Sequence, residues 1–133
     1  MELKSFETIG RRIKQARKAK GQDQASLAKL IGVLPSRISL LERDRAHLVA
    51  SEASFFCKIL EVDLNWLIDG TIRSEYELFL TLNLDFSEYK SIPEHAKEKW
   101  LEKHTQRFAL QGINVAQQIQ TIVKKGTETA VSA

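Results

Sequence analysis

Apolar side chains recur every three or four residues in two short runs early in the chain, residues 24–31 and 35–42. The members of these two apolar stripes are Leu27, Ala28, Ile31, Ile38 and Leu41. A spacing of three and four residues is typical of an amphipathic helix with one buried face. Only residues 32–34 separate the runs, so the pattern predicts two short helices that meet at a steep angle with their stripes facing each other.

The residues at the ends of these helices agree with that prediction. Asp23 is suited to cap the first helix, because its carboxylate can accept the free N–H groups of the first turn. Gly32 can adopt the left-handed conformation that ends a helix, and Pro35 suits a first helical position because its missing N–H costs nothing there. Together these signals indicate a helix-turn-helix unit, whose outward side we expect to carry the function.

Helices are also predicted before and after this unit. Residues 5–20 place Phe6, Ile9, Ile13 and Ala16 on one stripe. Residues 51–60 begin with a possible Ser51 cap, and residues 64–69 end at Gly70. The apolar residues expected to fill the core from these two segments are Phe55, Ile59, Leu60, Leu64, Trp66 and Leu67. The first half of the chain is therefore predicted to be an all-α domain of five helices.

Residues 77–86 give two conflicting signals. Leu78, Leu80, Leu82, Leu84 and Phe86 alternate with polar residues, which favours a strand. The preceding Ser74 and Glu77 form the sequence of a capping box, and leucine-rich segments favour helix, so we expect a helix. The alternative is an edge strand that pairs with its copy in a second subunit.

A second capping-box sequence, residues 91–94, opens a long helical segment that is expected to run to about Lys125. One seam of this segment repeats every seven residues, and Ile119 lies on an adjoining position. The residues expected to dimerise are the four of the seam and Ile119, namely Leu101, Phe108, Val115, Ile119 and Ile122. Gly112 could end one helix and begin another. The apolar seam needs a partner, either residues 78–86 of the same chain or a second subunit. The small polar tail, residues 126–133, is expected to be disordered.

The net charge of +3 hides an uneven distribution. Residues 1–50 carry 11 Lys or Arg against 5 Asp or Glu, and residues 51–133 carry 9 against 12. A basic half with two outward-facing short helices is the composition expected of a DNA-binding protein. The single Cys57 excludes an internal disulfide and is interpreted as core. No run of 18 apolar residues and no apolar N-terminal segment occurs, so we expect a cytoplasmic protein with no membrane span.

The spacing of several residues resembles the Cro/C1-type (XRE-like) helix-turn-helix regulators, the family of phage repressors. The residues that carry the resemblance are Gln24, Leu27, Ala28, Gly32, Val33, Ile38, Ser39, Glu42 and the closing segment 62–70. The resemblance covers roughly residues 6–70. It implies a five-helix lambda-repressor-like DNA-binding domain in residues 1–70, followed in residues 71–133 by a mainly helical oligomerisation or interaction region with a disordered tail.

The resemblance also implies roles for individual side chains. Pro35, Ser36 and Leu40 would lie nearest the base edges, and Arg37 would contact either guanine or a phosphate. The residues expected at the DNA backbone are Gln24, Ser39, Arg43 and Arg45. Arg17 would form an ion pair with Glu42. The chain departs from the family at two positions: Leu34 replaces the usual Ser or Thr cap, and Asp44 replaces a usual glycine.

The function that this pattern implies is a sequence-specific transcription regulator, most simply a repressor that binds an inverted repeat in double-stranded DNA as a homodimer. Two alternatives use the same fold: an antitoxin-type autorepressor that binds a partner protein through its C-terminal region, and a protein-interaction adapter that binds no DNA. We expect no enzyme and no cofactor, because His47, His95 and His104 lack metal-ligand spacing. We expect no self-cleaving peptidase either, because only 63 residues follow Gly70.

Overall fold

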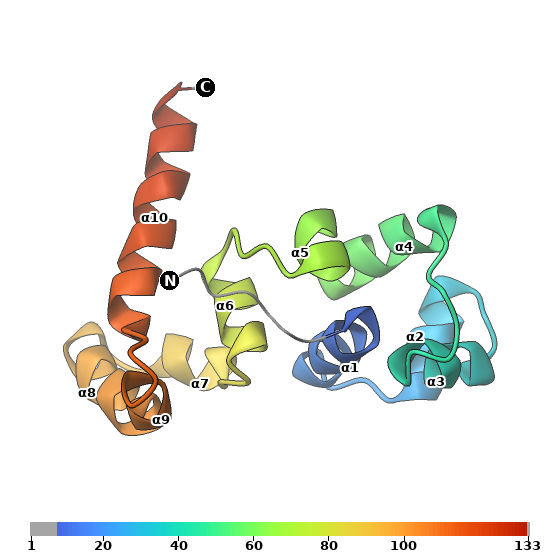
Figure 1. Cartoon of the computed structure of the whole chain (residues 1–133), viewed down its shortest axis with the longest axis horizontal. Helices are drawn as coiled ribbons and strands as arrows, with labels where there is room; N and C mark the ends of the chain where they lie inside the picture. The colour runs from blue at the N-terminus through green and yellow to red at the C-terminus, as the bar shows by residue number, and fades with distance from the viewer. Residues whose placement is uncertain (1–7, 133) are drawn as a thin grey trace. The chain divides into compact units, whose positions relative to one another are not determined.

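The computed structural model describes the backbone of residues 8–132 and the side chains of residues 8–123 (Figure 1). The described residues form helices and no strand, which confirms the all-α prediction. The chain divides into two compact units, the first ending at Ile72 and the second beginning at Arg73. The sequence had placed the boundary two residues earlier, directly after Gly70.

The first unit contains five helices around one core. Their bounds are α1 (Ile9–Ala19), α2 (Gln24–Ile31), α3 (Pro35–Glu42), α4 (Ala50–Leu60) and α5 (Leu64–Asp69). Helix α1 packs against α3, α4 and α5, and α2 packs against α3 and α4. The buried apolar side chains are Ile13, Ala16, Leu27, Ala28, Ile38, Leu41, Ala53, Phe56, Leu60, Val62, Trp66 and Leu67. The predicted stripes of α2 and α3 thus face the core, which leaves their other sides exposed.

The ends of α2 and α3 are formed as the sequence predicts. The Asp23 carboxylate accepts the N–H of Ser26 at 2.7 Å, and Gly32 ends α2 in the left-handed conformation with φ 89°. Pro35 is the first residue of α3, and Leu34 at the cap position makes no side-chain hydrogen bond. Helix α3 therefore begins without the side-chain cap that α2 has.

Helix α4 begins earlier than predicted, and its buried face is shifted. Its cap is Val49, not Ser51, and the Glu52 carboxylate accepts the Val49 N–H at 3.2 Å. The buried residues follow a helical period through Ala53, Phe56 and Leu60. Phe55, predicted to be core, is consequently 54% exposed.

Two further core predictions differ from the structure. Leu64 lies at the start of α5 on its outer side and is 49% exposed, whereas Trp66 and Leu67 are fully buried. Cys57 is half-buried. Phe6 lies outside the described residues, so the predicted start of the first helix cannot be compared beyond Thr8, which is the cap of α1.

The start of α1 is held close to the end of α3. Asp44 has the left-handed conformation, with φ 58°, and its carboxylate accepts the Gly10 N–H at 3.0 Å and the Thr8 hydroxyl. A β-carbon on Gly10 would lie 2.3 Å from the carbonyl oxygen of Leu41. The glycine therefore permits the close approach, and Asp44 takes the place of a glycine because Asp tolerates this conformation.

The second unit contains α6 (Glu75–Thr81), α7 (Phe86–Ser91), α8 (Glu94–His104), α9 (Gln106–Ala109) and α10 (Val115–Ser132). Residues 75–81 are helical and not an edge strand, and the Ser74 hydroxyl accepts the Glu77 N–H as the capping-box sequence predicts. Asn83, with φ 55°, then turns the chain before α7. Leu78 and Leu80 lie in this helix, and Phe79 between them is buried as well. Leu82 and Leu84 follow in the turn, so the helix expected over residues 77–86 ends at Thr81.

Aromatic rings build the core of this unit. The Phe79 ring lies 5.0 Å from that of Phe86, 4.8 Å from that of Tyr89 and 6.3 Å from that of Trp100, measured between centroids. These residues come from α6, α7 and α8, so stacked and edge-on rings join three short helices that could not be stable alone.

The long helical segment predicted from residue 91 is instead three helices, α8 to α10, that are interrupted at Thr105 and between Leu110 and Asn114. Ser91 does not cap α8, because it belongs to α7 and its hydroxyl is donated back to the Glu88 carbonyl. Helix α10 packs on α6 and α8. The partner of the apolar seam is thus the chain's own α6 and α8, one of the two alternatives that the sequence left open.

The seam proposed for dimerisation is largely used within the chain. Leu101, Val115 and Ile119 are buried, and Phe108 and Ile122 are half-buried. Among the large apolar residues of this region, Leu110 is 90% exposed and Val123 is 48% exposed. The backbone of residues 126–132, expected to be disordered, lies in α10, and their side chains are outside the described residues. No helix of the described chain combines the length and hydropathy needed to cross a membrane.

Candidate nucleic-acid interface

The first turn of α3 is open to solvent. Leu34 is 73% exposed, and Pro35 and Ser36, which follow it, are exposed too. Leu40, one helical turn beyond Ser36, is 38% exposed. Pro35, Ser36 and Leu40 are the side chains expected nearest the base edges, and the structure places all three on the outside of the first unit. In a helix-turn-helix protein the start of the second helix is the part that enters the major groove.

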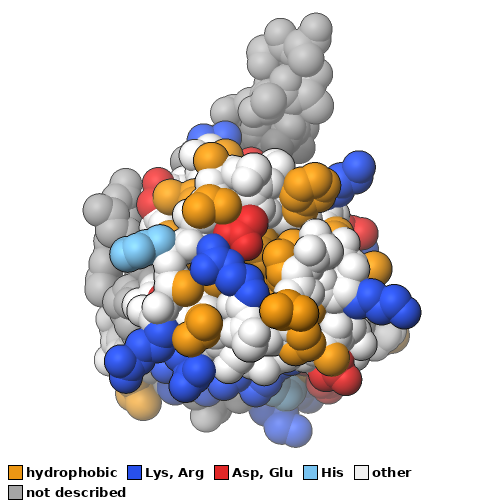
Figure 2. Space-filling view, turned by 90° about the vertical axis from the view of Figure 1, so that its right-hand side faces the viewer, with side chains coloured by type: hydrophobic (Ala, Val, Ile, Leu, Met, Phe, Trp, Pro, Cys, Tyr) orange, Lys and Arg blue, Asp and Glu red, His pale blue; other side chains and the backbone are white. Residues whose placement is uncertain are grey.

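Figure 2 shows one face of the molecule in which apolar side chains alternate with basic ones. Lys and Arg side chains gather toward the lower left of this view, and several apolar patches lie between them and the upper edge. The exposed large apolar residues of α2 and α3, with the residue preceding α3, are Leu30, Leu34 and Leu40. The surface therefore offers apolar contacts together with cations, a combination that suits the thymine methyl groups and phosphates of DNA.

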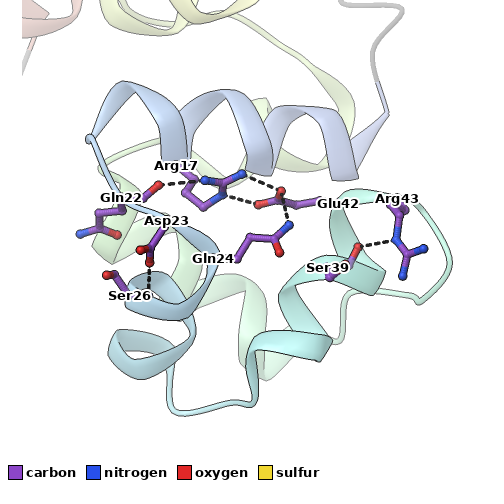
Figure 3. A network of polar contacts seen from close by, with 8 residues as sticks. All are labelled: Arg17, Gln22, Asp23, Gln24, Ser26, Ser39, Glu42 and Arg43. Atoms are coloured by element: carbon purple, nitrogen blue, oxygen red, sulfur yellow. Dashed lines mark hydrogen bonds and ion pairs between the residues drawn. The ribbon is translucent and has the colours of Figure 1, made fainter.

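A buried polar network holds α3 against α1 and α2 (Figure 3). The Arg17 guanidinium donates from Nε to Glu42 Oε2 at 2.6 Å and from Nη2 to Glu42 Oε1 at 3.0 Å. It also donates from Nη1 to the Gln22 carbonyl at 2.8 Å. The hydrogen bonds to Glu42 raise the pKa of Arg17. Because both side chains are almost fully buried, this bidentate pair fixes the end of α3 on α1.

Gln24 belongs to the same network. Its Nε2 donates to Glu42 Oε1 at 3.1 Å, so the amide expected at a phosphate is directed toward the core side of α3 and is half-buried (Figure 3). A phosphate at the start of α2 would also meet the Asp23 carboxylate, which already accepts the Ser26 N–H. The structure therefore gives Gln24 a structural contact that the sequence did not indicate. A phosphate contact would require its amide to change partner.

Arg37 differs most from its expected position. Its Nε and Nη2 donate to the two carboxylate oxygens of Glu52 at 3.0 and 2.6 Å, and Nη2 also donates to the His47 carbonyl at 2.8 Å. These hydrogen bonds raise the pKa of Arg37 and lower that of Glu52. Arg37 thus links α3 to α4 and to the loop between them. A bidentate contact with guanine or phosphate would require Nε or Nη2 to leave Glu52.

The remaining expected phosphate contacts lie at the end of α3. Arg43 and Arg45 are exposed, and the Arg43 Nε donates to the Ser39 carbonyl at 3.3 Å (Figure 3). Ser39 is half-buried. The structure therefore leaves both arginines at the surface on the side of α3 where Asp44 meets α1.

Arg12, a residue of α1 outside the predicted apolar stripe, has a structural role. It is 3% exposed, and its guanidinium donates to the carbonyls of Leu67 and Ile68 at 2.8 and 2.9 Å. These carbonyls lie near the end of α5, where a helix lacks internal donors. No sequence signal connects residues so far apart in the chain. The side chains of the described residues form no cluster of three or more His, Cys, Asp or Glu suited to a metal ion.

The geometry, two helices joined by a three-residue turn with an exposed second helix, defines a helix-turn-helix protein, a class of DNA-binding transcription regulators. Comparison with protein families agrees: residues 13–67 match the family described as Helix-turn-helix. The chain belongs to this family.

Two solved structures resemble the chain, and both are of the P22 c2 repressor. One is a crystal structure of that repressor in complex with a synthetic operator, 29% identical, which covers 50% of this chain and 100% of the other with a TM-score of 0.48. The second is the nuclear magnetic resonance structure of its DNA-binding domain, 30% identical, which covers 46% of this chain and 80% of the other with a TM-score of 0.44. A comparison with curated protein sequences finds no match.

Proposed function

We propose that this protein is a sequence-specific transcription repressor that binds double-stranded DNA as a homodimer on an inverted repeat. The observation that supports the proposal best is the exposed start of α3, where Leu34, Pro35 and Ser36 project from a helix fixed by the Arg17–Glu42 pair. A rigid helix with an exposed first turn can enter a major groove with little loss of conformational entropy. Repression would follow from steric exclusion of polymerase in the cytoplasm.

Dimerisation is proposed because one such domain makes few base contacts. Two domains that bind half-sites roughly 34 Å apart contact the same side of the DNA and add their contacts. The second unit would supply the dimer interface, but not through Leu101, Val115 and Ile119, which are buried within it. An autorepressor that also binds a partner protein through this unit is a second form of the same proposal.

The experiment is selection of bound duplexes from a random pool, followed by sequencing and by measurement of protein mass in solution. We expect an inverted repeat whose half-site centres lie about one helical turn apart, and a dimer on DNA. A pool that yields no preferred sequence would favour the adapter alternative, in which Leu34 and Leu40 contact protein. A single half-site occupied by a monomer would contradict the dimer alone.

A matched pair of variants tests the orientation of α3. Ser36→Ala changes an exposed residue of the first turn, whereas Ser54→Ala changes an exposed residue of α4. We expect Ser36→Ala to alter the selected sequence at one base pair of each half-site, and Ser54→Ala to leave the selected sequence unchanged. An identical selected sequence for both variants would place the first turn of α3 away from the bases.

A further inference from the structure

The Arg37–Glu52 pair lies beside the residues proposed to contact DNA, and Glu52 holds the guanidinium of Arg37. Arg37 is in the first turn of α3, directly after the exposed Ser36. An arginine at this place is within reach of DNA whenever its guanidinium is free. Here both carboxylate oxygens of Glu52 and the His47 carbonyl accept its N–H groups. The cation is therefore directed toward α4 instead of outward.

Glu52 is well supported in this position. The carboxylate also accepts the Val49 N–H at 3.2 Å, so the backbone at the start of α4 helps to fix it. One residue further on, Ala53 anchors α4 in the core. The Glu52 side chain is 14% exposed and that of Arg37 28% exposed, so the pair is partly shielded from water. A phosphate would have to replace two charge-assisted hydrogen bonds to release Arg37.

We propose that Glu52 is a positioning residue of the DNA site, which holds Arg37 away from DNA and thereby lowers the sequence-independent part of the binding affinity. The inference rests on the proposed function. A cation that contacts phosphate strengthens binding to every sequence alike, because phosphates carry no sequence information. Holding one cation beside the first turn of α3 away from DNA therefore lowers the affinity for operator and non-operator DNA by the same factor, and leaves base recognition to Ser36 and to the exposed apolar side chains Leu34 and Leu40.

The test measures binding of the full chain to a non-operator duplex and to the selected operator as a function of salt concentration. Glu52→Gln keeps the size of the side chain and one oxygen for the Val49 N–H, but removes the charge that holds Arg37. We expect the released arginine to contact one phosphate of the non-operator duplex. The slope of log K against log salt should become steeper by about 0.9. The ratio of the affinity at 50 mM salt to that at 200 mM salt should be about 3.5-fold larger in Glu52→Gln than in the wild type. The operator affinity should rise by the same factor, so the ratio of operator to non-operator affinity should stay unchanged.

Two further variants separate this role from a structural one. Arg37→Met should leave the non-operator slope at the wild-type value, because Arg37 makes no phosphate contact in the wild type. The double variant Arg37→Met, Glu52→Gln should return to that value, because no cation is left to release. Glu98→Gln, an exposed residue of α8, changes the net charge by the same amount and should not change the slope by 0.9.

Several outcomes would overturn the inference. A slope that becomes shallower by about 0.9 in Arg37→Met would show that Arg37 contacts phosphate in the wild type. Equal slopes in Glu52→Gln and Glu98→Gln would show that Glu52 does not restrain Arg37. A changed ratio of operator to non-operator affinity in Glu52→Gln would overturn the phosphate contact, because a contact that distinguishes sequences is made to a base. Failure of the proposed function has a different signature, since the wild type would then select no operator, whereas the non-operator slopes would still decide the role of Glu52.

Discussion

The charges of Arg17 and Glu42 depend on each other because both side chains are nearly fully buried. Removing one partner of such a pair leaves a buried charge without compensation. We therefore expect Glu42→Ala to lower the free energy of unfolding by about 3–5 kcal/mol, measured by urea denaturation. Gln24 would lose its acceptor as well.

A control is available at the surface. Glu61 pairs with Lys20 at 2.9 Å, but the Glu61 side chain is 73% exposed, so water replaces the lost contact. Glu61→Gln should leave the urea midpoint nearly unchanged. If Glu42→Ala costs no more than Glu61→Gln, the buried pair does not hold α3 in the way described.

At Gly10, whether a change to alanine stabilises or destabilises the protein tests how closely α1 approaches α3. In an ordinary helix a change from glycine to alanine stabilises by about 0.5–1 kcal/mol. At Gly10 the added carbon would lie 2.3 Å from the Leu41 carbonyl oxygen, so we expect Gly10→Ala to destabilise by about 1–3 kcal/mol instead. The thermal midpoint should fall, and a rise would show that α1 and α3 are not in close contact.

At the scale of helices, α3 begins without a side-chain cap, and this can be repaired. Leu34 precedes α3 in an extended conformation suited to a cap, yet makes no side-chain hydrogen bond. Leu34→Ser would supply a hydroxyl to the free N–H groups of the first turn and should stabilise the protein by about 1 kcal/mol, measured by thermal unfolding. Leu30→Ser, also at an exposed leucine but inside α2, should give no such gain.

The link between α3 and α4 gives a dependence on pH. Glu52 has a lowered pKa in the folded protein, chiefly because of its hydrogen bonds with Arg37. Its contribution to stability is therefore fully present above the ordinary value of 4.5 and is lost as pH falls through the lowered value. Glu52→Gln has no carboxylate to protonate at this position, so it should lose less unfolding free energy than the wild type as the pH falls. The difference in unfolding free energy between wild type and Glu52→Gln should shrink below about pH 4.5 and stay constant above it.

The helices that sequence analysis predicted correctly are those with local signals at both ends. Asp23, Gly32 and Pro35 fix α2 and α3 within a few residues, and Ser74 fixes the start of α6. The start of α4 was wrong because Val49 offers no polar side chain, and the capping comes from Glu52 three residues later. The predicted core face was wrong for another reason: Phe55 and Ile59 have the same four-residue spacing as the buried Phe56 and Leu60, so the period alone does not distinguish the two stripes.

Contacts distant in the sequence could not be predicted from the residues alone. The seven-residue seam is the clearest case, because Thr105 and Gly112 divide it among separate helices that pack on α6. Arg37 is another, since an exposed arginine and an arginine paired with Glu52 have the same sequence signature. The Arg17–Glu42 pair was anticipated because the family resemblance implied it, not because any spacing within the chain required it.

At the scale of the whole molecule, each unit has its own core and contains one of the two tryptophans. Trp66 lies in the first unit and Trp100 in the second. Phe56→Leu and Phe79→Leu, both at fully buried positions, should each cost about 1 kcal/mol but in different units. We expect Phe56→Leu to shift the unfolding reported by Trp66 and Phe79→Leu that reported by Trp100. Trp100→Phe and Trp66→Phe backgrounds isolate the two signals, and a shift of both by either change would show a single cooperative unit.

Several arginines of the first unit bind groups of the same chain, and this affects the association of the protein with a polyanion such as DNA. Of the eleven cations counted in residues 1–50, Arg12 binds the carbonyls of α5, and Arg17 and Arg37 are paired with carboxylates. The carboxylates cancel the charges of Arg17 and Arg37 at long range, so the field around the first unit is weaker than the number of cations suggests. Capture of DNA by diffusion would then depend on outer side chains such as Arg43 and Arg45, which steer the first encounter before any base is recognised.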